Sequence, residues 1–275
     1  MTISVFTDEI NRTDPARAIK LAAEWGVSHV EVRSLTGGRF PAVSDEELKA
    51  YQGMVEDAGL QVSGVSPGFF KCPTDGPAVA AGFSEGLPRA CEWAQRLGTD
   101  LVSCFGFRRG TESAVPAAAV DGLGRMADIV TAAGCRLVLE NEAVCWGATG
   151  VEAAEIIRQI GLDRISLLWD PGNSCRAGST CPHPDEYETF RDMVTHLHVK
   201  NFDPEAGEWA VAESGIVDWP AQFQALKEDG YSGYVVIETH LAISPDEFEV
   251  TDPEFSGLEA NTHRNLEYVR RCLRK

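Results

Sequence analysis

The sequence has few basic residues for its size. Its 275 residues include 24 lysines and arginines against 42 aspartates and glutamates, which gives a formal net charge of −18. Nucleic-acid affinity depends largely on basic side chains that neutralise phosphates. We therefore expect no nucleic-acid partner.

Long hydrophobic runs are also missing. No apolar stretch approaches the roughly 20 residues that a transmembrane helix requires, and the segment 1–8 has neither the basic start nor the apolar core of a secretory signal. These absences predict a cytoplasmic protein with no membrane partner. The eight cysteines include no Cys-x-x-Cys pair, so we expect free thiols rather than a zinc knuckle or a redox motif.

Glycine motifs that bind nucleotides are absent as well. The junction after the first expected strand lacks Gly-x-Gly-x-x-Gly, and no Gly-x-x-x-x-Gly-Lys-Ser/Thr occurs anywhere. This absence weakens the case for a doubly wound sheet that binds nucleotides. The composition itself, with 44% hydrophobic and 24% charged residues, is that of an ordinary globular protein.

Strand-like and helix-like segments alternate along the whole chain. Short runs rich in Val, Ile and Leu are each followed by a helical pattern. The expected strands are 3–7, 27–33, 60–65, 100–105, 135–140, 165–169, 195–199 and 233–238. The expected helices are 14–25, 44–59, 77–97, 113–133, 150–160, 184–194, 219–229 and 254–273. Eight such units predict a single α/β domain over 1–275, a (β/α)8 TIM barrel, with a doubly wound open sheet as the competing fold.

Polar residues gather where four of the expected strands end. In a barrel of this kind the active site lies at the carboxyl ends of the strands. Carboxylate oxygens together with an imidazole nitrogen suit a divalent ion such as Mn, Mg, Co or Zn. The sequence therefore predicts a site for one metal ion. Its clusters are Glu140-Asn141, Asp170-Pro-Gly-Asn173, His198-Val-Lys-Asn201 and Glu238-Thr-His240.

These clusters resemble the motifs of the xylose isomerase-like TIM barrels, a family that includes tagatose and psicose 3-epimerases, hydroxypyruvate isomerase, inosose dehydratase and endonuclease IV. The family pattern is Leu-Glu on strand five, Asp with a polar residue three positions later on strand six, His-x-x-Asp/Glu/Asn on strand seven and Glu on strand eight. The resemblance covers essentially the whole chain. The matching residues are Leu139-Glu140, Asp170 with Asn173, His198 with Asn201, and Glu238.

The resemblance implies both a metal site and a chemistry. Glu140, Asp170, His198 and Glu238 would hold one divalent metal, which would be Mn, Co, Mg or Zn. Glu140 and Glu238 would also be the catalytic residues that remove and return a proton beside a substrate carbonyl, through an enediolate. The implied activity is that of a metal-dependent isomerase or epimerase of a sugar, a sugar acid or a polyol-derived ketone. Relatives often form dimers or tetramers, so the resemblance also implies a homo-oligomer.

One position departs from the family's 3-epimerases and endonucleases, which carry histidine where this chain has Asn173. An amide binds a hydroxyl group but does not exchange protons with it. An inosose-type dehydratase, a lyase that uses the same site, is therefore the main alternative. Endonuclease IV-like repair and a non-catalytic sugar-binding barrel are weaker alternatives, and the acidic surface argues against the former.

Other polar residues are expected near the substrate, each with a structural alternative. Asn173 and Lys200 would contact the substrate, although an ion pair is equally reasonable for Lys200. Glu31 and Arg33 would contact the substrate or, as we slightly prefer, pair with each other. His240, two residues past Glu238, would either enter the site or remain outside it.

Four further residues have simpler expected roles. His196 is expected to be a packed or hydrogen-bonded core histidine, and Asp218 is expected to cap the helix 219–229. The loop 66–71 is expected to place Phe69 or Phe70 over the mouth of the site, where an aromatic wall would exclude water.

Overall fold

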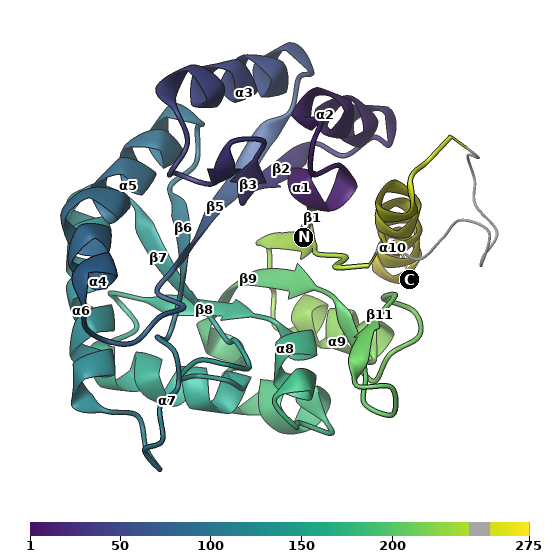
Figure 1. Ribbon diagram of the computed structural model, residues 1–275. Helices are drawn as coiled ribbons and strands as arrows, with labels where there is room; N and C mark the ends of the chain where they lie inside the picture. The colour runs from purple at the N-terminus through teal and green to yellow at the C-terminus, as the bar shows by residue number, and fades with distance from the viewer. Residues whose placement is uncertain (242–253, 275) are drawn as a thin grey trace.

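Eight parallel strands form a closed barrel in the computed structural model, which describes residues 1–241 and 254–274 (Figure 1). The order around the barrel is β1-β12-β9-β8-β7-β6-β5-β2, and β1 pairs with both β12 and β2. The predicted (β/α)8 barrel is thus confirmed. The strands are β1 (Thr2–Phe6), β2 (His29–Val32), β5 (Gln61–Phe69), β6 (Leu101–Phe105), β7 (Arg136–Glu140), β8 (Ser166–Trp169), β9 (Val194–Val199) and β12 (Tyr234–Ile237).

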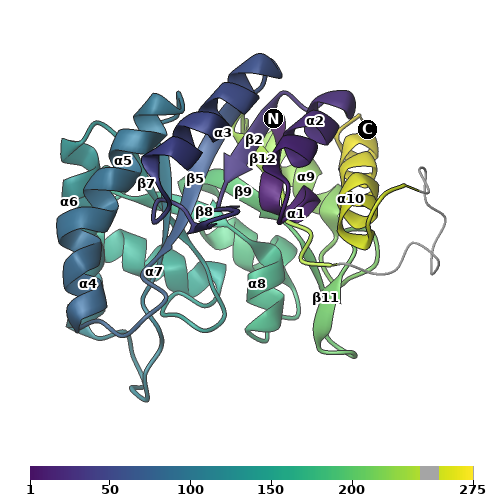
Figure 2. The same ribbon diagram turned by 45° about the horizontal axis from the view of Figure 1, so that its top comes forward.

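Helices cover the outside of this barrel, as the two ribbon views show (Figures 1 and 2). The side chains of β7 that point outward, Leu137 and Leu139, belong to the same buried core as Leu123 and Met126 of the covering helix α6. No helix in the described part of the chain is both long and apolar enough to cross a bilayer. The main covering helices are α2 (Pro15–Glu24), α3 (Asp45–Asp57), α4 (Pro77–Ala81), α5 (Leu87–Arg96), α6 (Ala117–Ala132), α7 (Gly150–Ile160), α9 (Trp219–Glu228) and α10 (Gly257–Arg274).

The helix expected at 184–194 is wrong. This segment consists of three short helical turns, Pro182–Glu186, Tyr187–Thr189 and Arg191–Met193. His183 precedes Pro184 and has an extended backbone (φ −131°, ψ 132°), because a residue before proline is sterically excluded from the helical region. The helix that directly follows β8 is instead the short α8 (Pro171–Arg176), which the sequence analysis did not predict.

Small elements surround the carboxyl end of the barrel. The helix α1 (Thr7–Ile10) follows β1, the hairpin of β3 (Ser34–Leu35) and β4 (Gly38–Arg39) follows β2, and a second hairpin follows β9. This second hairpin pairs β10 (Asn201–Asp203) with β11 (Glu208–Ala210), and Figure 2 shows β11 projecting from the body of the protein. These elements form the rim of the site.

Both apolar and polar side chains fill the barrel interior beneath the site. Leu101, Val138 and Leu168 from β6, β7 and β8 form a separate buried cluster inside the ring. Because side chains alternate along a strand, Glu140 lies on the same face as Val138, one step closer to the carboxyl end. The apolar cluster therefore lies under Glu140, while Glu31 of β2 and His196 of β9 are also buried inside the ring.

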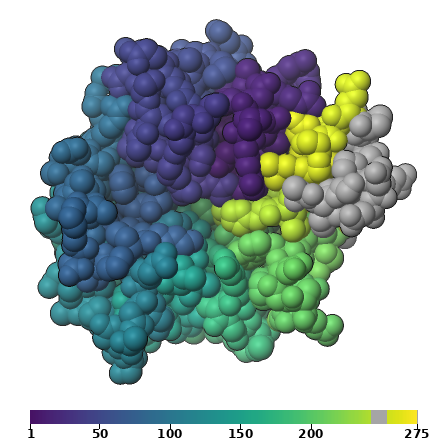
Figure 3. Space-filling model, viewed as in Figure 1, coloured from purple at the N-terminus to yellow at the C-terminus, as the bar shows by residue number. Residues whose placement is uncertain are grey.

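The two ends of the described chain meet beside the barrel. The helix α10 packs against α1, and Figure 3 shows its surface directly beside the N-terminal segment. Glu259 of α10 accepts hydrogen bonds from Asn11 (3.1 Å) and Arg17 (Nε, 2.5 Å). It also forms a capping box with Ser256, since each residue's backbone N–H bonds the other's side chain. Glu259 thus ties the last helix to the first.

We predict that Glu259→Gln lowers the free energy of unfolding by about 1 kcal/mol at pH 7. Burial alone would raise the pKa of Glu259, but Arg17 and the Ser256 amide lower it to about 2. A carboxylate with a lowered folded-state pKa stabilises the fold above its unfolded-state pKa, and this contribution is lost as the pH falls through the folded-state value. Urea unfolding of both proteins between pH 7 and pH 2 should show the difference shrinking below about pH 4.5. A difference that does not depend on pH would contradict this origin.

Candidate active site and metal centre

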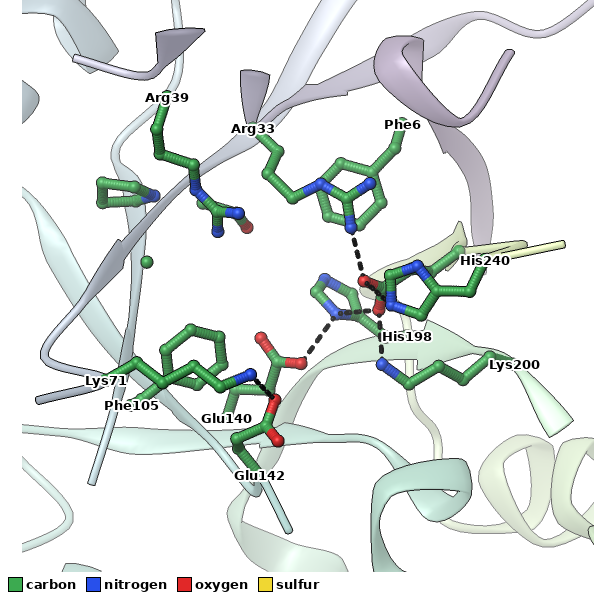
Figure 4. A pocket seen from close by; sticks show the side chains of 14 residues that line it. Phe6, Arg33, Arg39, Lys71, Phe105, Glu140, Glu142, His198, Lys200 and His240 are labelled. Carbon is green, nitrogen blue, oxygen red and sulfur yellow. Dashed lines mark hydrogen bonds and ion pairs between the residues drawn. The ribbon is translucent and has the colours of Figure 1, made fainter. Parts of the chain in front are cut away.

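A cavity of about 280 Å³ opens at the carboxyl end of the barrel (Figure 4). Phe6 and Phe105, the last residues of β1 and β6, form its aromatic walls. The remaining wall is strongly charged, with basic and acidic groups facing one another across the space. The charged and imidazole groups are Arg33, Arg39, Lys71, Glu140, Glu142, His198, Lys200, Glu238 and His240.

The structure brings the four residues of the expected metal site together. Glu140, Asp170, His198 and Glu238 come from the ends of β7, β8, β9 and β12 and are all buried. One potential ligand atom from each lies within 4.8 Å of those from the others. Such a spacing suits a single ion bound at about 2.0–2.3 Å by each donor.

The unpaired atoms of this cluster fit a cation. His198 directs Nε2 at Glu31 (3.1 Å), so its Nδ1 faces Glu238 Oε2 (3.3 Å) and Glu140 Oε1 (3.6 Å). Nδ1 forms no hydrogen bond, and Asp170 Oδ2 contacts only the ammonium of Lys200 (2.8 Å). Burial alone would lower the pKa of His198, but Glu140 raises it, so the position between Nδ1 and the two carboxylates favours a positive charge, which a proton or a metal ion would supply. Glu140 forms no ion pair with lysine or arginine among the described residues, so its negative charge is available to a divalent ion.

Asp170 caps a helix and also faces the metal cluster. Its Oδ1 accepts the backbone N–H of Asn173 (2.8 Å) and caps α8, while Oδ2 points into the cluster. Gly172 allows α8 to begin here, because a Cβ at this position would lie 2.8 Å from Lys200 Cγ. Burial raises the pKa of Asp170 to about 7, although Lys200 opposes the shift.

Lys200 forms the ion pairs that were one of its two expected roles. Its Nζ lies 2.8 Å from Asp170 Oδ2 and 2.9 Å from Glu238 Oε2. The contact with Asp170 is an ion pair without hydrogen-bond geometry. Burial alone would lower the pKa of Lys200, but the carboxylates of Asp170 and Glu238 raise it. Lys200 also lines the cavity, so a substrate can still reach it.

Arg33 pairs with three carboxylates, and the predicted pairing with Glu31 is wrong. Its guanidinium lies 2.8 Å from Asp8 Oδ2 and 2.6 Å from Glu238 Oε1, and it also contacts Glu9. Glu31 lies deeper in the barrel and contacts His196 and His198 instead of Arg33. Arg33 still lines the cavity, so its expected substrate contact remains open.

Glu31 lies beneath the cavity and does not line it. Its carboxylate is fully buried and accepts hydrogen bonds from His196 (2.7 Å), His198 (3.1 Å), Ser66 (2.7 Å) and Ser63 (3.3 Å). Burial alone would raise the pKa of Glu31, but the two histidines lower it well below its usual range. From this position Glu31 orients His198 rather than contacting a substrate. His196 is the hydrogen-bonded core histidine that we expected.

Asn173 is also buried away from the cavity surface. Its amide nitrogen donates to Glu140 Oε1 (3.2 Å) and to the carbonyl of Asn141 (2.8 Å). The expected direct contact with substrate is therefore replaced by a contact with Glu140. Asn173 thus positions the Glu140 carboxylate from the side away from the cavity.

His240 does enter the site, and it joins Glu238 to Glu9. Its Nε2 lies 2.9 Å from Glu238 Oε1 and its Nδ1 3.0 Å from Glu9 Oε1. Burial alone would raise the pKa of Glu9, but Arg33 and His240 lower it to about 2. The sequence analysis missed Asp8 and Glu9, although they follow the first strand just as the predicted clusters follow theirs.

The predicted aromatic cover is wrong, and the predicted helix cap is confirmed. The strand β5 continues to Phe69 instead of ending at residue 65. Phe70 turns into the core and stacks on Phe107, and neither Phe69 nor Phe70 lines the cavity. Asp218 caps α9 by accepting the N–H of Ala221 (3.0 Å).

Comparisons with known proteins agree with this geometry. The sequence profile of the xylose isomerase-like TIM barrel family matches residues 19–271. The inosose dehydratase of Geobacillus thermodenitrificans (strain NG80-2) is 24% identical over 136 residues, which are 43% of this chain and 45% of that protein. The chain thus matches less than half the length of this curated relative.

Solved structures share the fold over the whole chain. The D-allulose 3-epimerase of Methylomonas sp. has a TM-score of 0.75 at 18% identity, and the match covers 99% of this chain and 98% of that one. A xylose isomerase-like barrel from Mycobacterium smegmatis, solved in complex with magnesium, has a TM-score of 0.69 at 19% identity over 99% and 97% of the two chains. Because the family profile covers most of the sequence, this chain belongs to the xylose isomerase-like TIM barrel family.

Proposed function

We propose that the protein is a metal-dependent isomerase or epimerase that moves a proton beside the carbonyl of a small carbohydrate or polyol-derived ketone. The observation that carries this proposal is the arrangement of Glu140 and Glu238. These two carboxylates approach His198 from different strands and both line the same cavity. Figure 4 shows Glu140 beside His198 there. Two such groups beside one substrate can remove a proton and return it.

Glu140, Asp170, His198 and Glu238 would hold the divalent ion. When bound, such an ion polarises a substrate carbonyl and stabilises the negative charge that develops as the neighbouring proton leaves. Mn, Co, Mg and Zn all suit this donor set. Lys200, which is held between Asp170 and Glu238, adds a fixed positive charge at the same wall.

The two glutamates differ in their surroundings, which supports different roles. Glu238 contacts Arg33, Lys200 and His240, so its negative charge is well compensated. Glu140 accepts one side-chain hydrogen bond from an amide, that of Asn173. Hydrogen bonds from cations stabilise the charged form of a carboxylate and weaken it as a base. We therefore assign proton removal to Glu140. Glu238 would return a proton that His240 passes to it, since His240 Nε2 lies 2.9 Å from Glu238 Oε1 and its pKa is raised, although burial alone would lower it, because Glu238 lies beside it.

A dehydratase is the second candidate, and Asn173 favours it. A 3-epimerase of this family carries histidine at that position, whereas Asn173 is buried and bound to Glu140. A dehydratase would use Glu140 for the same proton removal and would then expel a hydroxyl group from the next carbon. The partial similarity to an inosose dehydratase supports this alternative. An ultraviolet-absorbing enone product would distinguish it from an isomerase.

The first test is the metal content of the purified protein, measured by mass spectrometry. We expect one equivalent of a divalent metal in the wild type and its loss in His198→Ala, because the variant removes one donor of the four. His183→Ala is the matched control, since His183 lies outside the cavity and should leave the metal in place. Wild-type protein that binds no metal even after reloading would overturn the proposal.

The second test is proton exchange on candidate substrates. The metal-loaded protein is incubated with ketoses and inososes in D2O, and NMR follows deuterium entering the carbon beside the carbonyl. Exchange without loss of water supports an isomerase or epimerase, and loss of water supports the dehydratase. Metal binding with no exchange on any compound would favour a non-catalytic barrel.

A further inference from the structure

One guanidinium group faces the cavity without an anionic partner. Arg39 is the last residue of the hairpin β3–β4, and Figure 4 shows its side chain at the cavity across from Lys200 and His240. Among residues 1–241 and 254–274, no carboxylate oxygen lies within 4.0 Å of it, and no hydrogen bond from its side chain is formed. A guanidinium remains charged at any physiological pH. Arg39 is exposed, so its charge faces water and the cavity rather than an ion-pair partner.

The other cationic side chains of the cavity all have carboxylate partners. Arg33 contacts three carboxylates and Lys200 contacts two. Lys71 lies 2.7 Å from Glu142, and His240 bridges two glutamates. Arg39 therefore differs from its neighbours, although it lines a cavity that also contains Glu140 and Glu142.

The backbone of β5 holds Arg39 in this position. A Cβ built on Gly68 would lie 2.9 Å from Nη2 and 3.0 Å from both Cζ and Nε of Arg39. Because three atoms of the planar group are equally close, the guanidinium lies flat against Gly68. Gly68 also has φ +76°, a conformation that favours glycine. The N–H groups lie in the plane of the guanidinium, so this face contact leaves them available to a ligand.

The electrostatics agree with an empty anion position. Burial and then the nearby charge of Arg33 lower the pKa of Arg39, which is the direction expected where positive charge is not balanced. A bound anion would relieve this repulsion. A planar fork of N–H donors matches a carboxylate with two parallel hydrogen bonds.

We propose that Arg39 binds a carboxylate group of the substrate, so that the natural substrate is an acidic ketone such as a sugar acid. This inference rests on the proposed function, because the carbonyl end of the substrate would face Glu140 and Glu238 while its carboxylate reaches Arg39. A carboxylate fits better than a phosphate here, because Arg39 is the one lysine or arginine among the described residues of the cavity that has no carboxylate partner. A single guanidinium balances a monoanion rather than a dianion.

The test compares pairs of ketones that differ in one group. D-fructose and D-tagatose are paired with D-fructuronate and D-tagaturonate, in which a carboxylate replaces the terminal hydroxymethyl group. Their dissociation constants for the Mn-loaded protein are measured by calorimetry. We expect at least one acid to bind about 10- to 100-fold more tightly than its parent ketose, because a hydrogen-bonded ion pair contributes in this range. Arg39→Gln should abolish the difference without changing the affinity for the neutral ketose.

Two variants make the test specific. Arg39→Lys keeps the charge but loses the fork, so it should recover part of the preference. Arg12→Gln removes one positive charge from a residue outside the cavity and should retain the full preference. Equal affinity for acid and ketose in the wild type, or an unchanged preference in Arg39→Gln, would overturn the inference. Tighter binding of D-fructose 6-phosphate than of D-fructuronate would also overturn it, in favour of a phosphate.

The outcomes also separate this inference from the proposed function. Protein that binds metal and exchanges deuterium into neutral ketoses, with no preference for acids, refutes the carboxylate contact and leaves the proposed function intact. Protein that binds acids through Arg39 but takes up no metal refutes the proposed function instead.

Discussion

The variants Glu140→Gln and Glu238→Gln are expected to turn over substrate about 10²- to 10⁴-fold more slowly than the wild type. Glutamine has the size and shape of glutamate, but its amide does not take up or release a proton at neutral pH. The measurement is kcat at saturating metal, on the first ketone that exchanges deuterium. Circular dichroism and thermal unfolding should show that both variants keep the fold.

The control for this prediction is Glu142→Gln. Glu142 lines the same cavity and lies two residues from Glu140, but it pairs with Lys71 at 2.7 Å rather than with the metal cluster. Glu142→Gln should change kcat by less than about tenfold, because the variant removes an ion pair and no proton carrier. Near-normal turnover in either Glu140→Gln or Glu238→Gln would contradict the assigned roles.

Comparison of the two variants also distinguishes the two candidate reactions. If Glu140 removes the proton, Glu238→Gln should still exchange the substrate proton with D2O although it forms no epimer. Glu140→Gln should do neither. In a dehydratase that needs Glu140 as its base, Glu238→Gln would instead retain part of the water-loss activity. The pair of variants therefore tests both the order of proton transfer and the reaction class.

The parts of this site that the sequence predicts are those encoded locally. A buried parallel strand appears as a short apolar run, and the polar residue that ends it must lie at one end of the barrel. Glu140, Asp170, His198 and Glu238 were predicted for this reason. All four converge in the structure. Glu9 carries the same local signal after the first strand and could have been found by the same reasoning.

Other features depend on contacts between distant parts of the chain. The pairing of Arg33 with Asp8, Glu9 and Glu238 depends on the geometry of β2 and β12, which flank β1, and of the short helix α1 that follows β1. Arg39 is placed by a two-residue strand and by the glycine of another strand, neither of which has a distinctive pattern. Pairing of this kind is set by tertiary structure, so residue type and spacing do not predict it.

Glu31 is the clearest case of a residue whose role depends on its position in the barrel, and replacing it should have a large effect on stability. Its carboxylate accepts hydrogen bonds from His196, His198, Ser63 and Ser66, all of which are largely inaccessible to water. We expect Glu31→Ala to lower the free energy of unfolding by about 3–5 kcal/mol, because it leaves buried donors without a partner and opens a cavity. Urea unfolding at neutral pH measures this difference.

The same change should weaken metal binding, which a merely structural role would not require. Without Glu31, the ring of His198 loses the hydrogen bond that directs Nδ1 toward Glu140 and Glu238. Loss of such a support typically lowers metal affinity about 10- to 100-fold. Glu31→Gln keeps the volume but accepts fewer hydrogen bonds, so its Mn affinity should fall between those of Glu31→Ala and the wild type.

Ser103→Ala is the matched control for Glu31, because Ser103 belongs to the same interior network but reaches Glu31 through Ser66. Ser103→Ala should lower the free energy of unfolding by only about 1 kcal/mol and leave the Mn affinity unchanged. If Glu31→Gln and Ser103→Ala have the same stability and the same Mn affinity, then packing rather than Glu31 orients His198. A selective loss of affinity in the Glu31 variants would show that a carboxylate outside the cavity controls the metal site within it.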